Sequence, residues 1–159
     1  MIQVVFVCLG NICRSPLAEA IFKDLVQKAK LQHRFMIDSA ATSTWEIGNN
    51  PDHRTIANAQ THGISLNHKA QQFTKANYKA AHYVLVMDKS NLENIKPIIG
   101  QTDDNYQKVE LFRNYDPLGP GEVPDPYHGT SFDFELTYQI INRCALGLFE
   151  HIVREHQLI

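Results

Sequence analysis

The sequence has few cysteines, little net charge and no long apolar run, and each shortage excludes a class of protein. Three cysteines are too few, and an odd number, for the disulfide framework of a small secreted protein, which favours a reducing compartment. A formal net charge of -2 at pH 7 provides no overall attraction for nucleic acid or an anionic membrane. No apolar run reaches transmembrane length. We therefore expect a cytoplasmic protein with neither a nucleic-acid nor a membrane partner.

Short apolar runs alternate with segments of helical period, which predicts an α/β fold. Strands are expected at residues 2–7, 35–39, 81–87 and 109–112. Helices are expected at residues 15–29, 52–62, 74–78, from 90 or 91 onward, and at 132–156, with turns or loops at 97–107 and 113–131. This order predicts one domain, residues 1–159, with a four-stranded parallel sheet and helices on both faces.

Two helices have distinct polar and apolar faces in this prediction. Glu19, Lys23, Asp24 and Lys28 mark the polar face of the first helix. The last helix has an apolar stripe at a spacing of four residues, formed by Leu136, Ile140, Cys144, Leu148 and Ile152. Cys144 is therefore expected in the core.

Cys8 stands at the end of the first predicted strand, where parallel sheets bind ligands. A polar loop leads from it to Ser15-Pro16, a pair typical of a helix start, with Ser15 as the cap. Gly10 and Asn11 accept the positive φ that an anion-binding loop needs. Backbone N–H groups and Arg14 can then hold one phosphate-sized anion. The same groups favour the thiolate of Cys8, a nucleophile for phosphoryl transfer.

These residues also have a structural explanation, because a cysteine at a strand end is usually a small core residue. The extended pattern C-x-G-N-x-C-R-S-P is more specific than the C-x5-R spacing alone. On these residues the chain resembles the low-molecular-weight protein tyrosine phosphatases. The resemblance implies that Cys8 is the nucleophile and Arg14 the phosphate clamp. It also implies a phosphate-binding loop formed by Leu9, Gly10, Asn11, Ile12, Cys13 and Ser15.

The long loop 113–131 contains a second candidate, in the sequence Pro124-Asp125-Pro126-Tyr127. Expulsion of an aryl-oxide with a pKa of about 10 needs an acid, and a loop carboxyl group can supply that proton. Taken alone, Asp beside Pro indicates a turn. The D-P-Y element resembles the second motif of the same family, which implies that Asp125 is the general acid and base.

The resemblance also implies supporting residues. Asn11 would be held by Ser39 and His68, although an Asn in a turn and a surface His are the simpler explanations. Trp45 and Tyr127 are expected to form walls against the aryl ring of phosphotyrosine, since aromatic residues on loops often bind ligands. Alternatively, Tyr127 packs under its own loop and Trp45 covers the sheet edge.

Ile12 and Cys13 bear on specificity and regulation. Bacterial relatives that hydrolyse phosphoarginine have Thr at the position of Ile12, so Ile12 favours phosphotyrosine-containing proteins or peptides as substrates. Cys13 is expected to trap an oxidised Cys8 as a disulfide, which would make the enzyme redox-sensitive. No metal or other cofactor is expected, because a cysteinyl-phosphate route needs none and the histidines and carboxylates are not at ligand spacing. A monomer is expected.

The chain departs from the family pattern at three positions, and two other functions compete with tyrosine phosphatase. Ala41, Gln71 and His128 stand where the family commonly has Gly, Arg and a second Tyr, and the last puts regulation by double tyrosine phosphorylation in doubt. An arsenate reductase on the same scaffold would need further cysteines, and residues 82–107 have none. A phosphoprotein-binding module without turnover is disfavoured because the expected nucleophile, clamp and acid are all present.

Overall fold

A parallel four-stranded sheet forms the centre of the protein. The computed structural model describes residues 1–100 and 106–159. The strands are β1 (Ile2–Cys8), β2 (Phe35–Ala41), β3 (Tyr83–Val86) and β4 (Val109–Leu111). Their order in the sheet is β2-β1-β3-β4, and every neighbouring pair is parallel. The predicted α/β sheet is therefore confirmed.

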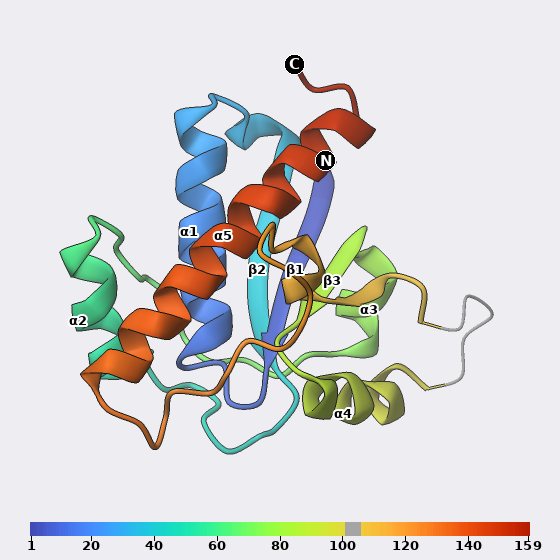
Figure 1. Ribbon diagram of the computed structural model, residues 1–159. Coiled ribbons are helices and arrows are strands. Elements are labelled where there is room, and N and C mark those ends of the chain that lie inside the picture. The colour runs from blue at the N-terminus through green and yellow to red at the C-terminus, as the bar shows by residue number, and fades with distance from the viewer. Residues whose placement is uncertain (101–105) are drawn as a thin grey trace.

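Helices cover both faces of this sheet (Figure 1). On one face, α1 (Arg14–Lys28) packs against α5 (Ser131–Glu155), which also contacts α2 (His53–Thr61). On the other face lie α3 (Lys75–Ala80) and α4 (Lys89–Ile99). Two 3-10 turns, η1 (Gln32–Arg34) and η2 (Phe112–Tyr115), precede β2 and follow β4. No helix in the described part of the chain is both long and apolar enough to cross a membrane.

The central strand β1 is buried on both faces, as its apolar sequence predicts. Val4, Phe6 and Cys8 face the core beneath α1 and α5, whereas Val5 and Val7 face the core beneath α4. The ring of Phe6 lies between those of Phe22 and Phe112, with centroid distances of 5.7 and 5.1 Å. Because Phe6 is packed on both sides, it holds the carboxyl end of β1, and with it Cys8, in a fixed position.

Helix α1 begins one residue earlier than predicted and lacks a side-chain cap. Asp52, Thr74 and Asp88 cap α2, α3 and α4 through their side chains. The residue before α1 is Cys13, whose side chain caps nothing, and Ser15 lies inside the helix. The prediction that Ser15 is the cap is therefore wrong. The N–H groups of the first turn of α1 stay free of a side-chain cap, which leaves them available to an anion.

Three further predictions need correction. Helix α4 continues to Ile99 through Pro97, where a turn at 97–107 is expected; residues 101–105 of that turn lie outside the described residues. Phe112 belongs to η2 rather than to a strand. Leu136 is 42% exposed, although it opens the predicted stripe of α5. A step of four residues turns about 40° around a helix, so a strict stripe rotates off the buried face.

Candidate active site

The loop between β1 and α1 wraps around the sulfur of Cys8. The Sγ atom lies 2.9 Å from Ser15 Oγ and accepts the backbone N–H of Asn11 at 3.3 Å. Asn11 has a φ of 59°, the left-handed conformation that its residue type predicts. Cys8, Asn11 and Ser15 are all buried. The sulfur therefore lies at the base of a tight turn that ends at the N-terminus of a helix.

Arg14 is the first residue of α1 and is only 2% exposed. Its Nη1 donates to Asp88 Oδ2 at 2.7 Å and to the carbonyl oxygen of Val123 at 3.0 Å. Burial alone would lower the pKa of Arg14. The pKa nevertheless lies above its ordinary value, because it is raised by the charges of Cys8, Asp125 and Asp88 and by the hydrogen bond to Asp88. The guanidinium is thus charged and fixed in direction.

Asp125 contacts the other terminal nitrogen of Arg14, Nη2, whereas Asp88 contacts Nη1. Asp125 Oδ2 accepts a long hydrogen bond of 3.5 Å from Arg14 Nη2, and Asp125 Oδ1 accepts the backbone N–H of Tyr127 at 3.1 Å. The Asp125 side chain is 43% exposed. A partly exposed carboxyl group beside the arginine is in a position to exchange protons with a bound substrate and with water.

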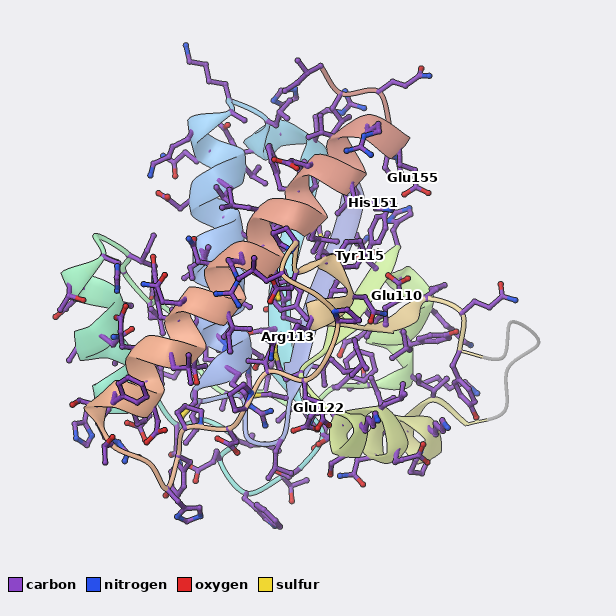
Figure 2. All side chains as sticks on the ribbon, in the orientation of Figure 1. Glu110, Arg113, Tyr115, Glu122, His151 and Glu155 are labelled. Carbon is purple, nitrogen blue, oxygen red and sulfur yellow. The ribbon has the colours of Figure 1, made fainter. Side chains whose placement is uncertain are left out.

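Ion pairs of the buried Asp116 hold the loop that carries Asp125 in place. Asp116, whose side chain is fully buried, binds Arg143 of α5 at 3.0 Å and Arg113 of η2 at 3.1 Å. Arg113 Nη1 in turn donates to the carbonyl oxygen of Glu122 at 2.9 Å (Figure 2). The side chain of Glu122 accepts the first backbone N–H of α4, and the N–H of Val123 binds the carbonyl that follows β3. These contacts hold the loop against the site.

Asn11 joins the loop to a hydrogen-bonded network beneath it. Its Nδ2 donates to Ser15 Oγ at 2.7 Å and to Ser39 Oγ at 3.0 Å. Its Oδ1 accepts from His68 Nε2 at 2.6 Å and from the backbone N–H of Gln71 at 3.0 Å. The structure thus brings Asn11, Ser39 and His68 together, as the resemblance implies. Every polar atom of the Asn11 side chain is occupied, which fixes the turn around Cys8.

Sequence reasoning missed two acidic residues of the site. Glu19, which the sequence places on the polar face of α1, is only 4% exposed; its Oε1 accepts from Ser39 Oγ at 2.6 Å and lies 3.2 Å from His68 Nδ1. The sequence did contain a sign that Glu19 lies near the site. Glu19 follows Ser15 by one helical turn, so both residues lie on the same face of α1. Asp88 lies two residues after the end of β3, so its place at the carboxyl edge of the sheet could have identified it.

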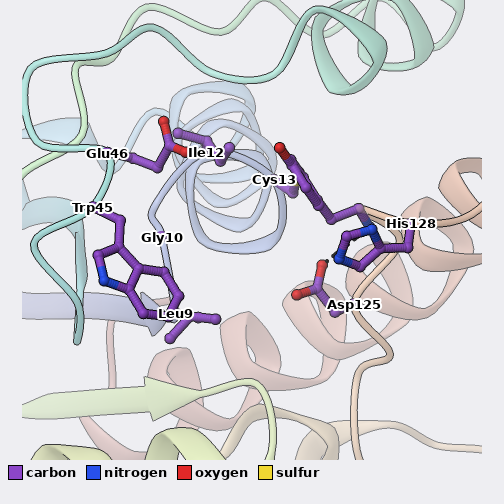
Figure 3. Close-up of a pocket in the computed structure, with 9 residues that line it drawn as sticks. Leu9, Gly10, Ile12, Cys13, Trp45, Glu46, Asp125 and His128 are labelled. Atoms are coloured by element: carbon purple, nitrogen blue, oxygen red, sulfur yellow. Dashed lines mark hydrogen bonds between the residues drawn. The ribbon is translucent and has the colours of Figure 1, made fainter.

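A hollow of about 230 Å³ opens above the loop (Figure 3). Figure 3 shows Trp45 and Leu9 on one side of it, and Asp125 and His128 on the opposite side. Trp45 is 76% exposed, so it does not cover the sheet edge. The remaining lining residues are Gly10, Ile12, Cys13, Glu46 and Tyr127. The hollow therefore has the apolar and aromatic walls that an aryl group needs.

Cys13 lines this hollow but is itself buried at 6% exposure. Burial raises the pKa of the Cys13 thiol to about 12. Cys144 lies in the core, as predicted, and burial also raises the pKa of its thiol to about 12. Both thiols therefore stay protonated at neutral pH, which distinguishes them from an activated nucleophile.

Comparison with known proteins agrees with this arrangement. Residues 3–158 match the family model described as low molecular weight phosphotyrosine protein phosphatase. The chain is 48% identical to the protein of that name from Gallus gallus over 148 residues, covering 93% of this chain and 94% of the relative. The crystal structure of a protein tyrosine phosphatase from Entamoeba histolytica with Hepes in the active site superposes with a TM-score of 0.90 at 28% identity, covering both chains completely.

A second solved structure, Vibrio vulnificus Wzb in complex with benzylphosphonate, superposes with a TM-score of 0.82 at 28% identity and covers 94% of this chain and 98% of its own. The family match spans almost the whole chain, and the relatives are matched over nearly their full length. The chain belongs to the low molecular weight phosphotyrosine protein phosphatase family.

Proposed function

We propose that this enzyme hydrolyses phosphotyrosine through a phosphorylated cysteine, with Cys8 as the nucleophile, Arg14 as the phosphate clamp and Asp125 as the general acid and base. The observation that carries this proposal is the environment of the Cys8 sulfur. Ser15 Oγ at 2.9 Å and the N–H of Asn11 at 3.3 Å both face it, at the uncapped N-terminus of α1. Hydrogen-bond donors and a helix N-terminus favour a thiolate.

In the first step, the loop N–H groups and the Arg14 guanidinium hold the phosphoryl oxygens. The Cys8 thiolate attacks phosphorus, the S–P bond forms and the bond to the tyrosyl oxygen breaks. Asp125 gives its proton to that oxygen, so neutral tyrosine leaves. Asp125 needs to be protonated for this step only, and its partial exposure allows it to exchange its proton with solvent.

In the second step, the Asp125 carboxylate takes a proton from water. The water oxygen attacks phosphorus, the S–P bond breaks, and inorganic phosphate leaves with the Cys8 thiolate restored. Arg14 acts in both steps because charge develops on the same three phosphoryl oxygens. Asp88 and the carbonyl of Val123 occupy Nη1, which aims the rest of the guanidinium.

The hollow above the loop supports an aryl phosphate as the substrate. Trp45 and Tyr127 line it and remain partly exposed, so they can contact a phenyl ring on entry. Ile12 adds an apolar contact in the same hollow, consistent with phosphotyrosine rather than phosphoarginine. The complex of Vibrio vulnificus Wzb with benzylphosphonate, in which one methylene joins a phenyl ring to a phosphonate, supports this choice. Phosphotyrosine-containing proteins or peptides are the proposed partners of a cytoplasmic monomer.

The test compares two substrates that differ in leaving group, p-nitrophenyl phosphate and a phosphotyrosine peptide, with EDTA and a thiol reductant present. Cys8→Ser should abolish turnover of both. Asp125→Ala should lose far more activity on the peptide, because nitrophenolate needs less help from an acid. Asp24→Ala, which removes a half-buried carboxylate of α1 that does not line the hollow above the loop, is the control. Equal losses of Asp125→Ala on both substrates would contradict the role of Asp125 as the acid. Residual turnover by Cys8→Ser would contradict the covalent step.

A further inference from the structure

The side chain of Arg54, in α2, contacts an aromatic wall of the substrate hollow without lining the hollow itself. Its guanidinium carbon lies 5.4 Å from the ring centre of Tyr127, which does line the hollow above the phosphate-binding loop. The same carbon lies 4.7 Å from the ring centre of Phe134, a buried residue of α5. A cation at these distances is attracted to the face of an aromatic ring. Arg54 therefore joins the exposed ring of Tyr127 to a buried part of α5.

A bidentate ion pair with Asp52 fixes the direction of this guanidinium. Arg54 Nε donates to Asp52 Oδ1 at 3.0 Å, and Arg54 Nη2 donates to Asp52 Oδ2 at 2.8 Å. The hydrogen bond from the Arg54 side chain is the largest cause that lowers the pKa of Asp52, so both charges are present at neutral pH. Two parallel hydrogen bonds set the plane of a guanidinium as well as its position. Arg54 is thus held in place although its side chain is 37% exposed.

Asp52 connects this ion pair to the phosphate-binding loop. Its backbone N–H donates to the carbonyl oxygen of Ile12 at 2.8 Å. A continuous series of contacts therefore runs from Ile12 through Asp52 and Arg54 to the ring of Tyr127. Both ends of this series line the hollow. The series consequently sets the position of the Tyr127 ring relative to the loop that holds the phosphate.

The Tyr127 ring has little other support. Tyr127 is 43% exposed, and its hydroxyl group makes no hydrogen bond within the described part of the chain. Its other ring contact is with His128, an exposed neighbour whose ring centre lies 4.9 Å away. An exposed side chain on a loop samples several rotamers unless a contact selects one of them. The contact with Arg54 is the one that comes from a fixed side chain.

We propose that Arg54 is a positioning residue that holds the Tyr127 ring as a wall for the aryl group of the substrate. This inference rests on the proposed function, because it concerns the aryl group of the same phosphotyrosine. It requires that Arg54 affect binding of the ring and not binding of the phosphate, which Arg14 and the loop N–H groups hold. If Arg54 only joined α2 to α5 through Phe134, its loss would not discriminate between ligands with and without a ring.

The experiment compares a ligand that has a ring, benzylphosphonate, with one that has none, inorganic phosphate. Dissociation constants are measured by NMR titration of wild type, Arg54→Gln and Arg34→Gln. Gln at position 54 keeps the backbone N–H that Asp52 accepts in capping α2. Arg54→Gln should weaken benzylphosphonate binding about threefold to tenfold and change phosphate binding by less than about twofold.

Arg34→Gln is the matched control, because it makes the same change of charge at an exposed residue. Arg34 directly precedes β2, at the amino end of the sheet, whereas the site lies at the carboxyl end. The control should bind both ligands as wild type does. Circular dichroism verifies that each variant is folded at the temperature of the titration.

A double-mutant cycle tests whether Arg54 acts through Tyr127. Tyr127→Leu removes the aromatic ring and keeps an apolar side chain. In that background, Arg54→Gln should cause no further loss of benzylphosphonate binding, because the ring that it positions is gone.

Three results would overturn the proposal: equal weakening of both ligands by Arg54→Gln, no weakening of benzylphosphonate, or the same loss with and without the Tyr127 ring. All three leave the proposed function standing, because wild type still binds phosphate and the aryl phosphonate. A wild-type protein that bound neither ligand would instead contradict the phosphate site, and with it both proposals.

Discussion

Replacing the buried Asp116 with Asn should destabilise the protein in a pH-dependent way. Asp116 binds Arg143 and Arg113. The hydrogen bond from Arg143 is the largest cause that lowers the pKa of Asp116, and the N–H of Leu118 and the arginine charges lower it further. Burial acts in the opposite direction, and the resulting pKa is about 2 instead of 3.8. The ionised form therefore stabilises the fold by about 2 kcal/mol at pH 7. Because the pKa is lower in the folded state, this contribution is complete well above pH 4 and is lost as the pH falls towards 2. At pH 3 about 1 kcal/mol should remain.

Urea unfolding of wild type and Asp116→Asn, at fixed ionic strength and several pH values from 7 to 3, measures this difference directly. Asn keeps the size of the side chain and one acceptor oxygen, so the variant isolates the charge. The control is Asp24→Asn, which removes the half-buried partner of the exposed Lys28 and should change stability much less at every pH. A stability difference between wild type and Asp116→Asn that stays constant from pH 7 to pH 3 would refute the reasoning.

Three further substitutions test other parts of the structure. Gly147→Ala should lower the melting temperature, because the new Cβ would overlap the carbonyl oxygen of Tyr115. This overlap should cost about 1–3 kcal/mol, which exceeds the gain in helix propensity. An unchanged or raised melting temperature would contradict this close contact. Asp88→Asn keeps the cap of α4 but removes the charge beside Arg14, so kcat/KM should fall at least about tenfold. Because Arg14 is only 2% exposed and loses a charged partner, the melting temperature should fall as well. After hydrogen peroxide treatment, Cys13→Ser should not recover activity with thiol, whereas wild type should; equal recovery would reject the disulfide.

The local features of the site follow from the sequence because each depends on a short stretch of chain. An apolar run, a residue tolerant of positive φ and a helix start within a few residues predict the turn around Cys8, and Asn11 has the expected φ of 59°. The same reasoning placed Ser15 as a helix cap, which is wrong. Its hydroxyl lies 2.9 Å from the Cys8 sulfur instead, and local helix statistics contain no information about that contact.

Contacts between distant segments were not predictable from the pattern of residues. Glu19 has the spacing of an exposed helix residue, but Ser39 from β2 and His68 from a loop meet it beneath the turn, and it is buried. Asp88 caps a helix and also binds Arg14, and only the first of these roles has a local signature. Both residues depend on strand order, which places the ends of β2 and β3 on either side of β1.

The most direct test of the proposed mechanism is to trap the phosphorylated enzyme. Asp125→Ala should slow hydrolysis of the intermediate as well as its formation, so p-nitrophenyl phosphate, whose leaving group needs little help, is the substrate of choice. Acid quench on the millisecond scale, followed by proteolysis and mass spectrometry, should find one phosphoryl group on the peptide that contains Cys8. It should be absent in the Cys8→Ser, Asp125→Ala double variant. Full turnover with no phosphorylated Cys8 at any quench time, or a phosphoryl group on another residue, would contradict the account.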